Sequence, residues 1–448
     1  MMPKTATARL FQRSALPAAR SLLAGVVLVA AAAGCASAKS PLPGAEGFGA
    51  LSRGGTGGRV LTVTSLDDST AAPAQGTLRW AIGQKGPRII KFAVAGNILL
   101  KDRLPITEPY VTIDGSDAPG QGICIRDHSL ELRNTHDVIV RYIRIRRGDV
   151  ETLKSLRQKG LRRPRGSEDL DTVSMQDSRN ILFDHVSLSW SNDEILGIVR
   201  CQNVTIQWCI LSEPLSSPNL HPYGDDHGFA MNASASTLTI HHCLFARYVM
   251  RGPQFEANDV RTFTPYDVQM EAVNNVMFDY RRSGSRYTTG IEDHPEQAIG
   301  RKFEFQFVNN YYLNPDDKRP EIQAVLKHGV VKSLRVYVSG NLGPRRPRKD
   351  LDEHVGLLTD KKQSLPQADA EVRAQIADQR LFASPVPVNV EDPVDAYQRV
   401  LEQAGCSHRR DAVDLQIIAD VKARRFTRPI KSQDEVGGWP DLKAPGPR

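Results

Sequence analysis

Short runs of alternating apolar and polar residues dominate the chain from Arg59 to about Asn341. The runs are rich in valine, isoleucine and aromatic residues, and glycine, asparagine, aspartate or proline separates them. This composition and period are typical of short β-strands. No amphipathic helical repeat of useful length occurs among them. The pattern predicts an all-β fold, with strands such as RVLTVTSL, RIIKFAV, VIVRYIRIR, ILFDHVSLS and FQFVNNYY.

The later runs are similar to one another, because each closes its apolar alternation on a polar or aromatic residue. The closing residues fall at positions 185, 208, 242, 275, 310 and 341. A repeat of this length, built from β-runs, predicts a solenoid in which each repeat forms one rung. Asn275, Asn310 and Asn341 are then expected to stack as an internal ladder, with each side-chain amide bonding to the next. We expect His185 and His242 to be corner or core residues rather than catalysts.

Beyond about Val386 the pattern becomes helical. VDAYQRVLEQAGC and DAVDLQIIADVKARRF have helical periodicity and acidic starts, and the second also has a basic end, which suits the helix dipole. We therefore expect residues 386–448 to form a short helical extension that packs on the β-solenoid of residues 39–385.

The N-terminus carries several basic residues followed by the apolar run Leu22–Ala33, which is too short to span a bilayer. This arrangement is typical of a signal peptide, here residues 1–38. The segment AAGC is similar to a bacterial lipobox with Cys35 as the lipidated residue, whereas ASA at Ala36–Ala38 fits ordinary signal peptidase cleavage. Both remain open. We expect a bacterial protein that is secreted or held in the cell envelope, with no membrane span and with Cys35 as the candidate lipid anchor.

The chain has 448 residues and a formal net charge of +7. A basic balance suits an acidic partner such as nucleic acid, anionic lipid or an acidic polysaccharide. No nucleic-acid-binding motif occurs, which argues against nucleic acid. A solenoid with capped ends has no need of a partner subunit, so we expect a monomer.

Five cysteines lie outside the N-terminal leader, and none belongs to a CxxC pair. Without such pairs a structural zinc site is not indicated. We expect these residues to be small members of the core. They are Cys124, Cys201, Cys209, Cys243 and Cys406.

Acidic residues recur on consecutive predicted rungs. Asp169 and Asp171 are two positions apart and share a strand face, and Asp193 and Glu194 follow the next run. Because neighbouring strands lie ~4.8 Å apart, these carboxylates can meet. Clustered carboxylates repel one another unless a cation is present, and oxygen ligands suit Ca²⁺. Spacing alone also allows ordinary solvated acids in turns.

An ordered series of motifs resembles the bacterial pectate lyases of polysaccharide lyase family 1, from about Gly44 to Pro440. The resemblance implies a right-handed parallel β-helix that cleaves polygalacturonate by β-elimination and uses Ca²⁺. The motifs are GGRVLTVTSL, GTLRWAI, YVTIDGSDAPGQGICI, VIVRYIRIRRGD, ILFDHVSLSWSNDE, NVTIQWCILSE, LTIHHCLFARYVMRGP and EVGGWP.

The resemblance also assigns roles to single residues. Asp169, Asp171 and Asp193 match calcium ligands of the family. Gly197 stands where the family has a further aspartate, and Glu194 is the candidate replacement. Arg251 matches the arginine proposed as the catalytic base, although arginine keeps its proton in proteins, so electrostatic stabilisation is the alternative role.

Substrate-binding positions match less well. His227 falls where the family often has a substrate-binding lysine. Gln254 and Glu256 follow Arg251 where the family usually has two basic residues. Arg247 and His241 are candidates to compensate, and ordinary solvated side chains are the alternative for both.

Three functions remain open after this comparison. The first is an exported Ca²⁺-dependent lyase acting on pectate, or on another polymer that contains uronate. The second is a β-helix that binds polysaccharide without turnover, which the residues at Gly197, Gln254 and Glu256 would explain. The third is a β-helical glycoside hydrolase, which would need a pair of carboxylates acting as acid and base or nucleophile. The acidic residues could provide such a pair, but the order of the motifs does not match that class of enzyme.

Overall fold

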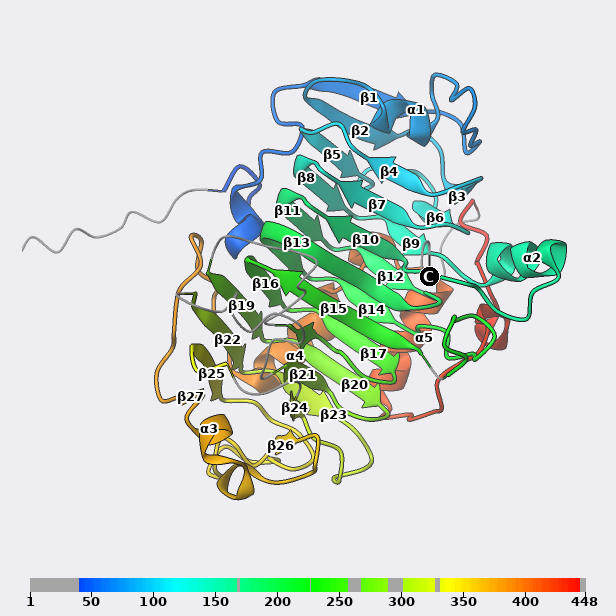
Figure 1. Cartoon of the computed structure of the whole chain (residues 1–448). Coiled ribbons are helices and arrows are strands. Elements are labelled where there is room, and N and C mark those ends of the chain that lie inside the picture. Colours follow the sequence, from blue (N-terminus) through cyan, green and yellow to red (C-terminus); the bar gives the residue numbers. More distant parts are fainter. Residues whose placement is uncertain are drawn as a thin grey trace, which may run out of the picture. The chain divides into compact units, whose positions relative to one another are not determined.

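The computed structural model describes residues 40–166, 170–225, 227–256, 267–288, 301–326 and 331–443. All of them belong to one compact unit, Ser37–Arg448. The predicted leader, with Cys35, and the predicted ligand Asp169 lie outside the described residues. Within the unit, parallel strands stack in rungs that follow the order of the sequence (Figure 1). The predicted parallel β-helix is confirmed.

The rungs contribute strands to three parallel sheets. The first sheet contains β1 (Arg59–Val63), β2 (Arg88–Phe92), β5 (Val111–Asp114), β8 (His136–Arg141), β11 (Arg179–Asp184), the second half of β13 (Glu194–Gln207), β16 (Thr237–His241), β19 (Val268–Val273), β22 (Phe303–Val308), β25 (Leu334–Ser339) and β27 (Ile376–Ala377). The second sheet contains β3 (Gly96–Leu99), β6 (Ile123–Arg126), β9 (Arg144–Arg146), β12 (Ser187–Ser189), β14 (Ile210–Ser212), β17 (Leu244–Tyr248), β20 (Val276–Tyr280) and β23 (Tyr311–Leu313).

The third sheet is the one that carries the candidate site. Its inward residues, such as Met175, Ile198 and Tyr287, are fully or almost fully buried, and outward residues such as Ser174, Asn232 and Arg286 are polar and partly exposed. The sheet contains β4 (Leu104–Ile106), β7 (Leu130–Arg133), β10 (Val173–Gln176), the first half of β13, β15 (Phe229–Ala235), β18 (Gln254–Phe255), β21 (Ser285–Thr288), β24 (Ile322–Val325) and β26 (Leu357–Thr359).

The core lies inside the stack, because the strand register repeats from rung to rung and places like residues above one another. One inward row of the first sheet is completely buried. Burying such apolar area is the main favourable term in folding. The row consists of Ile181, Val204, Leu238, Met270, Phe305 and Val336.

The predicted asparagine ladder is confirmed. Asn275 Nδ2 donates to Asn310 Oδ1 at 3.0 Å, and Asn310 Nδ2 donates to Asn341 Oδ1 at 2.9 Å. These bonds satisfy amides that would otherwise be buried without partners.

The alignment of the ladder with the earlier rungs was wrong by one position. The counterparts of His242 on the next rungs are Asn274 and Asn309, which share its left-handed backbone with φ near +50°. Two adjacent asparagines close each of these rungs, and alternation alone does not show which of the two turns the corner. His185 and His242 are indeed corner residues, and Trp208 stacks on His242 with ring centroids 4.3 Å apart.

The glycine-rich N-terminal segment crosses the outer face of the first sheet. Gly49 N donates to Thr205 Oγ1 at 2.8 Å, and Gly55 N donates to Thr112 Oγ1 at 2.9 Å. A Cβ on Gly49 would overlap the carbonyl oxygen of Ile181, so the close approach of the two backbones requires glycine there.

In the part of the chain that the structure describes, helices are few and lie outside the rungs. The sequence pattern missed α2, which projects from the stack (Figure 1) and ends at Gly160, where φ is +62°. Its apolar positions are too few to stand out from the surrounding strand pattern. Within the described ranges, no helix is both long and apolar enough to cross a membrane. The helices are α1 (Leu78–Ile82), α2 (Val150–Lys159), α3 (Ala370–Arg373), α4 (Pro393–Gln403) and α5 (Ala412–Lys422).

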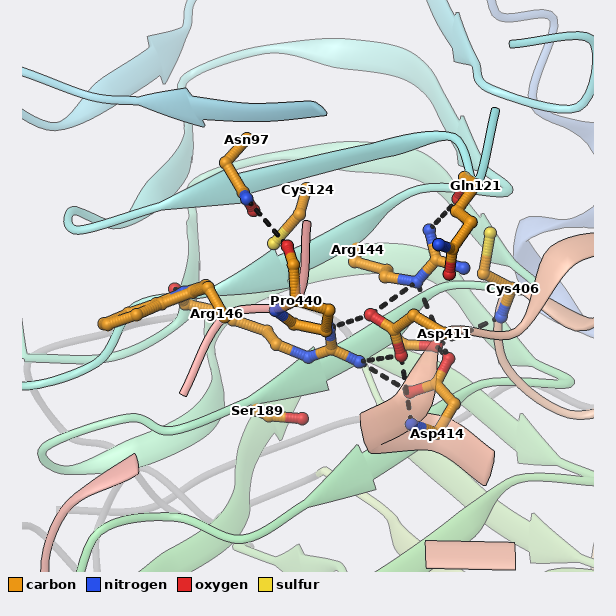
Figure 2. A network of polar contacts seen from close by, with 12 residues as sticks. Asn97, Gln121, Cys124, Arg144, Arg146, Ser189, Cys406, Asp411, Asp414 and Pro440 are labelled. Carbon is orange, nitrogen blue, oxygen red and sulfur yellow. Dashed lines mark hydrogen bonds and ion pairs between the residues drawn. The ribbon is translucent and has the colours of Figure 1, made fainter. Parts of the chain in front are cut away.

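The C-terminal segment contains α4 and α5 and belongs to the same compact unit as the rungs. Figure 2 shows Arg144 and Arg146 of β9 pointing toward the carboxylates of Asp411 and Asp414 at the start of α5. Arg146 Nη2 donates to Asp411 Oδ1 at 3.0 Å and to Asp414 Oδ1 at 2.7 Å, and all four side chains are buried. Burial alone would raise the pKa of Asp411, but the two arginines lower it to about 2.

All five described cysteines are free. They are also buried, as expected for small members of the core. Burial raises the pKa of the Cys124 and Cys201 thiols to about 12, which keeps them protonated and unreactive.

Candidate active site

Three carboxylates meet at the start of the third sheet's central strands. Asp171 precedes β10, and Asp193 and Glu194 lie at the start of β13 on the next rung. The register of β10 and β13 places Asp171 beside Glu194, whose backbone N–H donates to Asp171 Oδ1 at 3.1 Å. One oxygen from each of the three side chains lies within 4.8 Å of the others. We call this group the carboxylate cluster.

Burial and mutual repulsion disfavour the ionised forms of the three carboxyl groups in the carboxylate cluster. Burial raises the pKa of Glu194 to about 8, and the charge of Asp193 adds to the shift. Burial also raises the pKa of Asp171, with further increases from Glu194 and Asp193, and it raises the pKa of Asp193. Full ionisation of the cluster at neutral pH therefore needs a compensating cation.

Arg251 supplies one positive charge beside the carboxylate cluster. Its guanidinium forms an ion pair with Glu194 and lies over the ring of Phe229, 4.4 Å from the ring centroid. The backbone at Arg251 is left-handed, with φ of +69°, and its carbonyl accepts a hydrogen bond from Met231 N at 2.7 Å. The fold therefore holds Arg251 at the cluster rather than in solvent.

Two stacked histidines flank Asp193. The rings of His221 and His227 are nearly parallel, with centroids 3.5 Å apart. His221 Nε2 lies 3.2 Å from Asp193 Oδ2, and His227 Nε2 lies 3.4 Å from Asp193 Oδ1. Burial lowers the pKa of both imidazoles, so they are neutral at pH 7. The sequence indicated His227 only; the short spacing of the two histidines was the available signal for His221.

The comparison with known proteins decides the family. No model of a known protein family matches the chain. Over 408 residues the chain is 30% identical to a "Probable pectate lyase C" of Aspergillus flavus, across 91% of this chain and 83% of that protein. The chain belongs to the pectate lyase family. A second "Probable pectate lyase C", from Emericella nidulans, is 29% identical to this pectate lyase family member over 403 residues. The match covers 89% of this chain and 80% of the Emericella protein.

A solved structure supports the fold of this pectate lyase family member. Jun a 1, the major allergen from cedar pollen, matches with a TM-score of 0.56 and 18% identity, over 81% of this chain and 92% of that chain. The two relatives named above are fungal. The family expected from the sequence is thus confirmed, and the bacterial origin expected with it is not supported.

Gly197 explains one departure from the family pattern. It lies on β13, one residue beyond Leu196 and directly beside Ser174 of β10. A Cβ at Gly197 would overlap Oδ2 of Asp171. Asp171 thus occupies the space that a side chain at position 197 would need.

The outward row of the third sheet explains a second departure. Asn232, Gln254 and Arg286 lie side by side on β15, β18 and β21. Gln254 Nε2 donates to Asn232 Oδ1 at 3.2 Å and also to Glu256. Burial lowers the pKa of Arg286 to about 10, and the nearby charge of Arg251 adds to the decrease. A cation is therefore present one rung beyond the position where the family sequence pattern has it.

Arg247 and His241, the two residues expected to compensate, lie elsewhere and are buried rather than solvated. Arg247 is on β17 of the second sheet, where Nη1 donates to Glu213 Oε1 at 2.9 Å and Nη2 pairs with Asp420 of α5. His241 is on β16 of the first sheet, and its Nε2 lies 3.2 Å from Gln207 Oε1. Arg247 links the second sheet to the C-terminal extension, His241 joins two rungs of the first sheet, and neither lies at the carboxylate cluster.

Proposed function

We propose that this protein cleaves polygalacturonate by Ca²⁺-assisted β-elimination. One observation carries the proposal: the carboxylate cluster of Asp171, Asp193 and Glu194 stands directly against Arg251 on the third sheet of a pectate lyase family β-helix. A cation site next to a fixed guanidinium can bind a uronate carboxylate and stabilise the negative charge formed when the neighbouring C5 proton is lost.

The residues of the carboxylate cluster fit Ca²⁺. All three offer oxygen ligands, which this hard cation prefers, and burial has raised the pKa of each carboxyl, so a cation relieves their repulsion. Asp171, Asp193 and Glu194 would hold the ion, with Asp169 as a further ligand indicated by the sequence. When bound, Ca²⁺ neutralises the substrate carboxylate and acidifies the C5 proton beside it.

In the elimination the C5 proton would pass to water, the electrons of the C5–H bond would form the C4–C5 double bond, and the C4 oxygen would leave with the released chain and take a proton from water. Arg251 would stabilise the negative charge that develops on the uronate during this step. Its position over Phe229 and against Glu194 fixes the guanidinium without any rearrangement of the backbone. The resemblance to the family assigns it the role of base, and a permanent positive charge supports the electrostatic role. His227 and Arg286 would bind substrate oxygens on either side of it.

A direct assay tests the proposal. Purified protein is incubated with polygalacturonate, with Ca²⁺ or with chelator, and the absorbance of the unsaturated product is followed. We expect a Ca²⁺-dependent signal that is lost in Asp171→Ala and retained in Arg335→Ala, which removes an exposed arginine of the first sheet. No signal on either pectate or esterified pectin would refute the assignment.

A second candidate function is binding of an acidic polysaccharide without turnover. Gln254 and Glu256, which bond to each other beside Arg286, favour it, because they replace two cations with one neutral and one acidic group. Saturable binding of polygalacturonate with no unsaturated product would support this function, and product from another uronate-containing polymer would support a lyase of different specificity.

We also propose that the protein is exported and acts as a monomer, secreted or attached to the cell envelope through Cys35. The basic and apolar N-terminal pattern supports export. Mass spectrometry of the mature N-terminus distinguishes a lipid on Cys35 from cleavage after Ala38, and an intact leader on the mature protein would contradict export.

A further inference from the structure

A dense run of positive charge follows the first turns of α2. Positions 152 to 166 contain no aspartate or glutamate. Five of the cations are exposed, and none of the five forms an ion pair with a described residue. They are Arg157, Lys159, Arg162, Arg163 and Arg165. We call this group the cationic rim.

A cavity lies beneath the cationic rim. Its volume is about 790 Å³, within the range of about 300–1,000 Å³ typical of ligand pockets. Cations and hydroxyl groups line it together with apolar residues and one carboxylate, Glu151, which pairs with Lys154, and its wall includes Leu170, the residue before Asp171. Arg147 in the same wall donates to Asn192 Oδ1, and Asn192 adjoins Asp193, which places the cavity beside the carboxylate cluster. The lining includes Arg147, Thr152, Ser155, Lys159 and Arg165.

The cationic rim also reaches the histidine side of the site. Nη1 of Arg163 lies where a Cβ on Gly224 would be. Gly224 adjoins Asp225, whose carboxylate lies 2.8 Å from Nδ1 of His227. The rim therefore borders the candidate active site both at Leu170 and at Gly224.

We propose that the cationic rim and the cavity beneath it form a distal site for a stretch of polyuronate that extends beyond the point of cleavage. This rests on the proposed function of the neighbouring site and names how that site would engage a long chain. Unpaired cations close in sequence repel one another, and a polymer with a carboxylate on each sugar neutralises several of them at once. The hydroxyls of Thr152 and Ser155 offer hydrogen bonds to the sugar. The consequence is a preference for long chains over short oligomers.

The test measures binding separately from cleavage. Affinity for long polygalacturonate and for trigalacturonate is measured in chelator at low salt, with the full chain and with the triple variant Arg162→Ala, Arg163→Ala, Arg165→Ala. The matched control is Arg335→Ala, Lys361→Ala, Lys362→Ala, which removes the same charge from exposed positions elsewhere. We expect the rim variant to bind the long polymer about tenfold more weakly, from three contacts of about 0.5 kcal/mol each. Trigalacturonate binding should change less than about twofold, within the value of one surface pair.

Equal losses in the rim and control variants would show a general charge effect and overturn the proposal, as would unchanged binding in the rim variant. A protein that shows no lyase activity but loses long-chain binding only in the rim variant would refute the proposed function and support the distal site. A protein that cleaves pectate but whose rim variant keeps its full preference for long chains would refute the distal site alone.

Discussion

Arg251 and Glu194 form an ion pair across two rungs of the third sheet, with the guanidinium held over Phe229. The pair joins the residue that the family resemblance marks as catalytic to the carboxylate with the pKa of about 8. Arg251 should therefore affect the reaction rate, and Glu194 should affect how the stability of the protein depends on pH.

Replacing Arg251 by alanine should abolish most activity. The positive charge that faces the developing carbanion is lost, and removal of one such group costs about 100-fold or more in kcat. Initial rates on polygalacturonate at saturating Ca²⁺ check this. Rates within about twofold of the wild type would refute a catalytic role, and Arg335→Ala serves as the control for loss of an arginine.

The stability of the metal-free protein should fall as pH rises from about 4.5 to about 8. An unfolded Glu194 loses its proton near its ordinary pKa of 4.5, whereas the folded protein retains that proton up to about 8. Across this window the unfolded state binds fewer protons at this site, so raising the pH favours unfolding. Thermal unfolding in chelator at pH 5 and pH 8 measures the effect.

The variant Glu194→Gln isolates the contribution of this side chain, because it cannot titrate. Its Tm should decrease less than that of the wild type between pH 5 and pH 8. Added Ca²⁺ should stabilise the wild type more at pH 8, since the ion needs ionised ligands. Parallel decreases of Tm in both proteins would contradict the raised pKa of Glu194.

A methyl group at position 197 should disturb calcium binding more than folding. The Cβ of Gly197→Ala would overlap Oδ2 of Asp171, and the flexible carboxylate must move away from its neighbours in the carboxylate cluster. We expect Ca²⁺ affinity to fall about tenfold, a loss of about 1.4 kcal/mol, with Tm nearly unchanged. Ser174→Ala, at the paired position on β10, is the control. Unaltered calcium titration would show that Asp171 is not a ligand.

Arg286→Ala should raise KM for polygalacturonate with a smaller effect on kcat. Arg286 lies one rung from Gln254 and close enough to Arg251 for their charges to interact, so it can bind a substrate carboxylate beyond the reacting sugar. The effect should shrink on fully methyl-esterified pectin, which lacks that charge. A loss confined to kcat would instead place Arg286 in the chemical step.

Asp411→Ala should destabilise the protein strongly. It leaves Arg144 and Arg146 buried without their main counter-charge, a situation that costs about 3–5 kcal/mol. Chemical denaturation should show this decrease in the free energy of unfolding, whereas Glu402→Ala, an exposed change on the neighbouring helix, should be nearly neutral. Most exposed ion pairs contribute less than about 1 kcal/mol to stability. A decrease below that value would contradict a stabilising role for the buried ion pairs between β9 and α5.

The strands and the carboxylate cluster were predictable because both depend on local alternation and on the repeat of the rungs. Asp171 and Glu194 meet through a register that stacking imposes. Arg286 was not predictable, since a single arginine in a short strand gives no signal until the neighbouring rung is known. Arg247 is close to Arg251 in sequence, but its partners Glu213 and Asp420 come from another rung and from the C-terminal helix.

The ion pairs of Arg144 and Arg146 on β9 with Asp411 and Asp414 at the start of α5 can form only late in synthesis. Arg146 and Asp411 are 265 positions apart. The arginines of this early rung therefore gain their acidic partners only after nearly the whole chain has been made. Until then the second sheet carries two cations with no partners from α5. A chain cut short before α5 would keep every strand of the rungs but leave Arg144 and Arg146 without the carboxylates of Asp411 and Asp414, so truncation at the C-terminus should destabilise a rung near the start of the stack.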